Sequence, residues 1–304
     1  MASPPLSPAP SSKLRTFLRR LVSFIVLWTV VLSAMFCGSE LVSNYVFLLI
    51  MVFLVTTGAA EFYGLVEKRE LVCFKRWGIL GGVLLIIGTF LNLTGLIGTS
   101  GTPSRVNDFE TSFLILFVLG LCLLQFFSRS NTAGILAIST TLFGLMYVPW
   151  LLNFIQKINF FPRVNGHFYL LYFVLITKFS DTGAYLVGSL IGKHKMIPRV
   201  SPGKTWEGFG GAILGSTLAS VVFVAFLGSQ MAGMKLKHAI ILGGLLGLAA
   251  VVGDLIESIF KREAGVKDSG KFFPGIGGIL DLLDSLLFNA PIMYLYLRHI
   301  LTAP

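Results

Sequence analysis

Four acidic residues stand in apolar segments near the end of the chain, in two pairs with the same spacing. Asp254 and Glu257 lie three residues apart, and so do Asp281 and Asp284. Residues three apart share one face of a helix, so each pair would point its carboxylates in one direction. A carboxylate is costly to place in lipid and by default marks a functional site. Carboxylate oxygens suit Mg²⁺, and Asp254, Asp281 and Asp284 would form such a centre if their helices pack face to face.

Basic residues and glycines separate the two acidic pairs. The basic side chains could neutralise a polyphosphate, and Gly275, Gly277 and Gly278 would permit close backbone approach. Alternatively, the acids could form interhelical ion pairs that fix helix packing, for example Asp281 with Lys178. Four acids on two adjacent spans, facing a basic loop, exceed what packing needs, so a functional site is favoured. The basic residues between the pairs are Lys261, Arg262, Lys267 and Lys271.

A second polar cluster occupies residues 178–211. Asp181 lies one turn beyond Lys178, so the two side chains could pair. Residues 201–205 read Ser-Pro-Gly-Lys-Thr just before an apolar segment, and free backbone N–H groups at a helix start are natural phosphate sites. The alternative is a positively charged cytoplasmic loop with an ordinary helix cap. The candidate binding residues of this cluster are Asp181, Lys193, Lys195, Arg199, Ser201, Lys204, Thr205 and Glu207.

Composition identifies the kind of protein that carries these clusters. The 304 residues are 55% hydrophobic and 12% charged, with a mean hydropathy of +0.83. Soluble domains usually carry about twice that charged fraction, so we predict an integral membrane protein. The net charge of +10 is typical of cytoplasmic loops beside anionic lipids. No basic–aromatic interleaving points to nucleic acid, and the three cysteines have no metal-ligand spacing.

The predicted fold class is all-α, a polytopic membrane protein with about nine transmembrane helices. The first apolar run extends from Leu21 to about Cys37. Lys and Arg concentrate in the loops that lie inside if the N-terminus is inside and the C-terminus outside, whereas Lys157 falls in an outside loop. The further apolar segments lie near 43–62, 79–98, 111–128, 132–153, 168–192, 207–229, 238–260 and 276–300.

The spans divide into two halves according to their polarity. Residues 1–20 read as a disordered basic tail, and 21–160 as a helical scaffold, because the first five spans contain almost no internal charge. We expect residues 168–304 to form the half that carries the chemistry, a C-terminal catalytic half, because the polar residues gather in its spans. Its Gly183, Gly188 and Gly192 would let helices or a ligand approach closely. The absence of a convincing internal repeat argues against transporter folds built from inverted halves.

Both polar clusters carry the pattern of a known family. The segment Ser258-x-Phe260-Lys261-Arg262-x4-Lys267-Asp268-x-Gly270-x3-Pro274-x2-Gly277-Gly278-x2-Asp281-x2-Asp284 closely resembles the signature of the phosphatidate cytidylyltransferases, or CDP-diacylglycerol synthases. The earlier Asp181-x2-Ala184-Tyr185 and the stretch from Gly192 to Gly208 resemble that family's second motif. The chain departs at two positions, with Ile276 where the family usually has His and Leu282 where it usually has Arg.

The resemblance implies a Mg²⁺-dependent nucleotidyltransferase that makes CDP-diacylglycerol and pyrophosphate from CTP and phosphatidic acid. It also implies an enzyme of the inner membrane with its active site facing the cytoplasm; a second cation and a homodimer stay open. The catalytic residues would be Asp254, Asp281, Asp284, Lys267 and Asp268. The substrate-binding residues would be Ser201, Lys204, Thr205, Glu207, Ser258, Lys261, Arg262, Lys193, Lys195 and Asp181.

Two alternatives from the sequence involve different chemistry. A related CTP-dependent polyprenol or phytol kinase would transfer a terminal phosphoryl group to an alcohol and release CDP. An ion-coupled transporter would use Lys178, Asp181, Asp254, Asp281 and Asp284 as a coupling site. A transporter does not account for two basic, phosphate-like loops beside these charges on one side of the membrane.

Overall fold

The computed structural model describes residues 38–96, 103–128, 133–270, 272 and 277–302. The predicted tail 1–20 and the first predicted span, 21–37, lie outside these residues, as do Lys271, Gly275 and Ile276. Within the described chain, eight helical spans are long and apolar enough to cross a membrane. They coincide with the eight later apolar segments of the sequence, which confirms an all-α, polytopic membrane fold.

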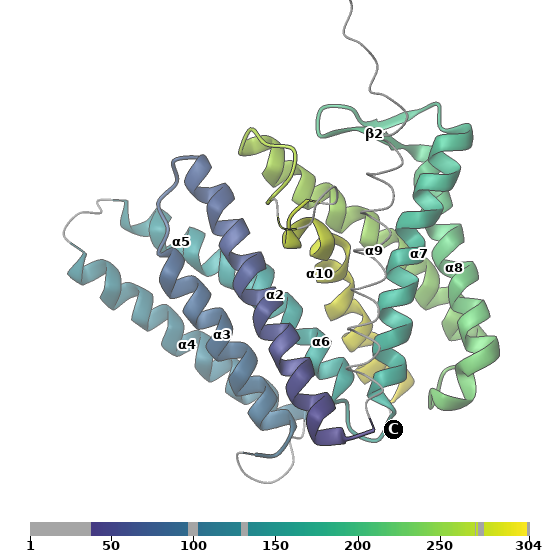
Figure 1. Ribbon diagram of the computed structural model, residues 1–304, viewed down its shortest axis with the longest axis horizontal. Helices are drawn as coiled ribbons and strands as arrows, with labels where there is room; N and C mark the ends of the chain where they lie inside the picture. The colour runs from purple at the N-terminus through teal and green to yellow at the C-terminus, as the bar shows by residue number, and fades with distance from the viewer. Residues whose placement is uncertain (1–37, 97–102, 129–132, 271, 273–276, 303–304) are drawn as a thin grey trace, which may run out of the picture.

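Successive spans run in alternating directions (Figure 1). The π-helical turn η1 (Met146–Trp150) contains Pro149, which has no backbone N–H, and joins two helices into one span. Short turns, η2 (Gly228–Gln230) and η3 (Leu297–Leu301), continue two others. The α-helices are α2 (Glu40–Lys68), α3 (Lys75–Leu93), α4 (Pro103–Phe127), α5 (Gly134–Leu145), α6 (Leu151–Asn159), α7 (Gly166–Ile191), α8 (Trp206–Leu227), α9 (Leu236–Glu263) and α10 (Ile279–Tyr296).

Helix α10 is the centre of the bundle. It packs against α2 and α6 on one side and against α7 and α9 on the other, so it joins the two groups of helices (Figure 1). Its most apolar stretch is 61% buried, the largest share among the eight spans. Asn289 of α10 donates hydrogen bonds to Thr177 Oγ1 of α7, at 2.8 Å, and to the carbonyl of Leu246 of α9, at 3.0 Å. The middle of α10 is therefore tied to both α7 and α9.

Small residues bring α7 and α8 into backbone contact. A Cβ atom added to Gly183 of α7 would overlap the carbonyl oxygen of Gly211 in α8, and a Cβ on Gly211 would overlap the carbonyl of Gly183. Such close approach is the usual role of glycine between membrane helices. The prediction that Gly183 lets a neighbouring helix approach is confirmed.

A two-stranded antiparallel hairpin adds β structure to the otherwise helical described chain. Strands β1 (Lys195–Ile197) and β2 (Ser201–Thr205) lie between α7 and α8. The sequence predicts a loop here, because its Pro, Gly and charged residues lack the alternating pattern of a strand. In Figure 1 the hairpin lies at the same face of the bundle as the loop between α9 and α10, opposite the C-terminal end of α10.

The expectation of almost no charge within the first five spans is wrong. Glu110 of α4 and Lys157 of α6 form an ion pair at 2.5 Å with both side chains buried. Asn153 Nδ2 donates to Glu110 at 2.6 Å and to Thr89 Oγ1 at 2.9 Å. The assignment of Lys157 to an outside loop is also wrong, because its helix continues to Asn159, beyond the apolar window that predicted the span.

Candidate active site

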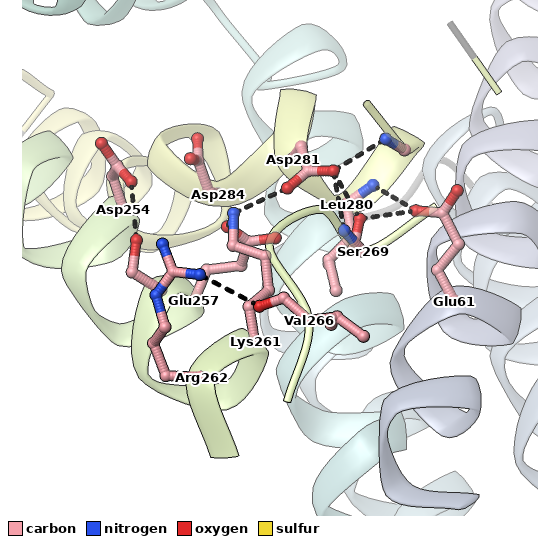
Figure 2. A network of polar contacts seen from close by, with 12 residues as sticks. Glu61, Asp254, Glu257, Lys261, Arg262, Val266, Ser269, Leu280, Asp281 and Asp284 are labelled. Carbon is pink, nitrogen blue, oxygen red and sulfur yellow. Dashed lines mark hydrogen bonds and ion pairs between the residues drawn. The ribbon is translucent and has the colours of Figure 1, made fainter. Parts of the chain in front are cut away.

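Three carboxylates from α9 and α10 gather at the face that carries the hairpin. One oxygen from each of Asp254, Glu257 and Asp284 lies within 4.8 Å of the other two (Figure 2). Asp254 and Glu257 share a face of α9 near its C-terminal end, and Asp284 lies in the second turn of α10. Helices α9 and α10 pack face to face, as the predicted metal centre requires. This packing brings Asp254 and Asp284 together, and Glu257 is the third carboxylate of the cluster.

Glu257 is the most deeply placed of the three carboxylates. Its side chain is fully buried, and its Oε2 forms an ion pair with Lys261, one turn further along α9. Its Oε1 has no hydrogen-bond partner among the described residues. A buried carboxylate oxygen without a partner is costly, and a bound cation would relieve that cost. Three carboxylates at this separation suit a hard divalent cation such as Mg²⁺.

Asp281 lies apart from this cluster and is held by other partners. It accepts hydrogen bonds from Lys261 Nζ at 2.6 Å, from the Ser269 N–H and Oγ–H at 2.9 Å each, and from the Gly278 N–H at 2.7 Å (Figure 2). Gly278 is the N-cap of α10, and Asp281 is three residues further on, where an acidic side chain can cap the start of a helix. Asp281 therefore ties Lys261 to the start of α10 and to the preceding loop.

Lys204 of the hairpin contacts the carboxylate cluster directly. Its Nζ lies 2.7 Å from Asp254 Oδ2, and about a fifth of its side chain is exposed. Ser258, also in the predicted site, donates to Asp254 Oδ1 at 3.3 Å. The two polar clusters of the sequence are thus one site in space, with two lysines, Lys204 and Lys261, beside the acids.

Arg262 and Glu207 hold the hairpin in place. Arg262 Nε donates to the carbonyl of Val200 at 2.9 Å, and its Nη1 donates to the carbonyl of Val266 at 3.2 Å, so it links the hairpin to the α9–α10 loop. Glu207, in the first turn of α8, accepts from the backbone N–H of Lys193 at 3.1 Å and pairs with His194 Nδ1 at 2.6 Å. Both side chains therefore bind protein groups in this structure.

Thr205 is the N-cap of α8. Its Oγ1 accepts from the Gly208 N–H at 3.1 Å, and the Trp206 N–H donates to the carbonyl of His194 at 2.9 Å. This arrangement is the ordinary helix cap that the sequence analysis kept as the alternative to a phosphate site.

The remaining candidate residues lie around the cluster. Lys178 approaches Asp181 at 3.5 Å, which confirms the predicted pair, and its Nζ also donates to the carbonyl of Leu282 on α10 at 3.1 Å. The interhelical pair expected in the structural alternative, Asp281 with Lys178, is not the one observed, because Asp281 binds Lys261. Ser201 is half-buried. The exposed candidates are Lys193, Lys195, Arg199, Lys267 and Asp268.

Glu61 also lies beside the site, although it is not among the candidates predicted from the sequence. It belongs to α2, about 200 positions before the carboxylates, yet it accepts from the backbone N–H groups of Ile279 at 3.0 Å and Leu280 at 2.8 Å (Figure 2). The available signal was an acidic residue within an otherwise apolar span.

The fold and the site together define a helical membrane protein with acidic and basic groups gathered at one face. A sequence profile described as the cytidylyltransferase family matches residues 18–300. The chain therefore belongs to the cytidylyltransferase family, and it is a nucleotidyltransferase. This confirms the resemblance inferred from the two motifs.

Three proteins with similar sequences align with different fractions of the chain. A phosphatidate cytidylyltransferase of Haemophilus influenzae is 32% identical over 289 residues, which cover 90% of this chain and 96% of that protein. One of Staphylococcus saprophyticus is 35% identical over 69% of this chain and 82% of that protein. The uncharacterized protein YnbB of Escherichia coli is 36% identical over about half of each chain, 52% of this one and 51% of YnbB.

Proposed function

We propose that the chain is a CTP:phosphatidate cytidylyltransferase, which makes CDP-diacylglycerol and pyrophosphate from CTP and phosphatidic acid. The observation that carries the proposal is the cluster of Asp254, Glu257 and Asp284, within 4.8 Å of one another and adjoined by Lys204 and Lys261. Membership of the family supports the nucleotidyl transfer. The two relatives named phosphatidate cytidylyltransferase support the lipid substrate.

Asp254, Glu257 and Asp284 would hold a divalent cation, which we propose to be Mg²⁺. When bound, the cation would supply positive charge to the phosphates of the nucleotide. The ligand set predicted from the sequence contained Asp281 where this proposal has Glu257. We assign Asp281 a positioning role instead, because four hydrogen bonds already engage its oxygens. A second cation stays an open prediction.

Lysines adjoining the carboxylates would bind the triphosphate and the departing pyrophosphate. Lys204 and Lys261 reach the cluster from the hairpin and from α9, and Lys267 lies exposed on the neighbouring loop. Arg262 would act mainly through the hairpin and the loop that it joins. Catalytic roles for Lys267 and Asp268 remain predictions from the resemblance.

Basic side chains of the hairpin would attract the lipid substrate. Lys193 lies just before β1, Lys195 in β1 and Arg199 in the turn between the two strands, and all three are exposed. Basic groups near a membrane surface attract anionic headgroups. Phosphatidic acid would therefore approach the site from the membrane surface at the hairpin.

The reaction itself needs no protein nucleophile. An oxygen of the phosphatidic acid phosphate would attack the α-phosphorus of CTP, forming a new phosphorus–oxygen bond. The bond from the α-phosphorus to the bridging oxygen would break, and pyrophosphate would leave with that electron pair. Since the attacking oxygen is already anionic, the side chains would contribute positioning and charge neutralisation rather than proton removal.

The finer topology is also part of the proposal. We place nine helices in the inner membrane, with the N-terminus and the active site at the cytoplasmic face and the C-terminus outside. Residues 21–160 and 168–304 would be a supporting half and a catalytic half. The hairpin and the α9–α10 loop carry many basic residues and share one face, which supports a cytoplasmic site. A homodimer stays open.

The deciding experiment uses the purified full chain in detergent micelles with phosphatidic acid and radiolabelled CTP. We expect labelled CDP-diacylglycerol and one pyrophosphate per lipid product, with no turnover when Mg²⁺ is chelated. Release of CDP with an alcohol acceptor would instead indicate a polyprenol or phytol kinase. Ion-driven solute flux in proteoliposomes without nucleotide turnover would indicate a transporter.

A further inference from the structure

Glu61 of α2 contacts the beginning of α10 and the loop before it. Its carboxylate accepts from the N–H groups of Ile279 at 3.0 Å and Leu280 at 2.8 Å, and it lies 3.1 Å from the hydroxyl of Ser269. The first N–H groups of a helix have no partner within the helix, and a negative charge there is stabilising. Glu61 therefore holds the start of α10 from a distant part of the chain.

Two glycines of the signature leave the space that Glu61 occupies. A Cβ atom on Gly270 would overlap Oε1 of Glu61, and one on Gly278 would overlap its Oε2. Neither Gly270 nor Gly278 has a positive φ, so neither position needs glycine for a left-handed backbone conformation. The space filled by Glu61 accounts for the absence of a side chain at Gly270, and together with the Ser269 hydroxyl it does so at Gly278.

A short series of contacts connects Glu61 to the carboxylate cluster. The Ser269 hydroxyl lies within hydrogen-bonding distance of both Glu61 and Asp281, at 3.1 and 2.9 Å. Asp281 binds Lys261 at 2.6 Å, and Lys261 pairs with Glu257. Figure 2 shows Glu61 and Asp281 on opposite sides of Ser269. If Glu61 moved, the movement would therefore be passed to Lys261 through the side chains of Ser269 and Asp281.

We propose that Glu61 is a positioning residue for the reaction, which fixes the first turn of α10 and thereby the positions of Asp281, Asp284 and Lys261. The proposal rests on the proposed function for the reaction that it affects. It also gives the N-terminal half a direct part in the site, beyond that of a scaffold.

Glu61→Gln tests the proposal, with Glu67→Gln as the matched control. Gln keeps the size of the side chain but has no charge for the helix start, and one of its two terminal groups cannot accept a hydrogen bond. Glu67 lies on the same helix, is half exposed and pairs with Lys75 at 2.8 Å. We expect Glu61→Gln to lower kcat roughly tenfold or more with an unchanged KM for CTP, since small misplacements of reacting groups carry large costs in rate. Glu67→Gln should match the wild type, and Glu61→Asp should be intermediate.

Hydrogen–deuterium exchange provides a readout that does not depend on the reaction. Exchange of the amides of residues 277–280 should be faster in Glu61→Gln than in the wild type and in Glu67→Gln. If kcat and exchange both stay at wild-type values, or if kcat falls while exchange is unchanged, the positioning role is overturned. If the wild type fails to make CDP-diacylglycerol, the proposed function fails, whereas the exchange comparison still tests the contact.

A double-mutant comparison tests whether the missing side chain at Gly270 makes room for Glu61. Gly270→Ala should lower turnover in the wild-type background, because its methyl group overlaps Glu61. In the Glu61→Ala background the same substitution should have a smaller effect, since the two atoms nearest to the added methyl group both belong to the Glu61 carboxylate. Equal and additive losses in both backgrounds would show that Gly270 does not accommodate Glu61.

Discussion

Two groups of buried charge lie in opposite halves of the chain and differ in how completely their charges are matched. In the N-terminal half, Glu110 and Lys157 form a pair with side chains 7% and 3% exposed. Asn153 donates to Glu110, and the Lys157 ammonium group lies over the rings of Phe154 and Tyr294 at 4.5 and 5.3 Å. Each of the two charges has a partner of opposite sign, so the pair fixes helix packing and its charge is balanced without a bound ion.

The C-terminal group contains more acid than base. Asp254, Glu257, Asp281 and Asp284 face two contacting lysines, Lys204 and Lys261, and one buried oxygen of Glu257 lacks a hydrogen-bond partner among the described residues. A surplus of negative charge around a fully buried carboxylate such as Glu257 is costly unless a cation joins it. Both groups contain buried charge, so burial alone does not identify a functional site. The candidate site differs from the Glu110–Lys157 pair because its acidic groups outnumber the lysines that contact them.

Removing one partner of the matched pair should have the largest effect in this molecule. Lys157→Met leaves Glu110 buried without a counter-charge, and we expect a loss of about 3–5 kcal/mol in the free energy of unfolding. Denaturant unfolding in detergent measures it. Glu110→Gln with Lys157→Met should recover most of the loss, whereas Lys75→Met, at the exposed pair with Glu67, should cost under about 1 kcal/mol. A large loss in the double variant would contradict a purely packing role.

Removing one charge from the unmatched group should instead reduce turnover. Asp284→Asn keeps the size of the side chain, so folding should persist, while turnover falls on the order of 100-fold or more because charge stabilisation at the phosphates weakens. Labelled-CTP turnover and thermal unfolding, measured together, separate the two effects. Unchanged turnover would refute a metal role for Asp284.

Glu257 and Asp281 distinguish the two possible ligand sets. We expect Glu257→Gln to raise the half-saturating Mg²⁺ concentration about 10-fold or more, as the loss of a cation ligand should. Asp281→Asn should lower kcat and speed hydrogen exchange around residue 269, with a smaller change in Mg²⁺ dependence. If instead Asp281→Asn raised the half-saturating Mg²⁺ concentration and Glu257→Gln did not, Asp281 would be the cation ligand in place of Glu257.

The smallest effect should come from the exposed hairpin lysines. Each lysine near an anionic surface contributes about 1 kcal/mol, so Lys193→Gln and Lys195→Gln should each raise the apparent KM for phosphatidic acid roughly fivefold. The effect should fade at high salt, because exposed charges are screened. Salt-independent losses, or losses in kcat alone, would argue against a role in attracting the lipid.

The sequence predicted the eight described spans and the meeting of Asp254 with Asp284, because apolar length and a spacing of three are local features. It did not separate Glu257 from Asp281, since that spacing shows only that each pair shares a face. The capping pattern of Gly278 and Asp281 was an available signal. Glu61 could not be placed, because its contacts with Ile279 and Leu280 connect residues more than 200 positions apart.

The buried pair in the N-terminal half was missed because the predicted apolar segments were shorter than the helices. Glu110 and Lys157 fell just outside the apolar windows, and the helices extend beyond those windows far enough to bury both residues. Polar residues at the end of a span can be buried when a partner from another helix satisfies them, which a sequence window does not register.

The capped helix starts have a consequence for how the enzyme distinguishes its anionic substrates. The amides at the start of α8 bind Thr205 and a carbonyl, and those at the start of α10 bind Glu61 and Asp281. The backbone donors at these two positions are therefore already engaged, so under the proposed function the phosphate groups would be bound by lysine ammonium groups on flexible side chains. Such groups act as adjustable point charges. Recognition at this site should depend on the quantity of negative charge offered more than on its shape.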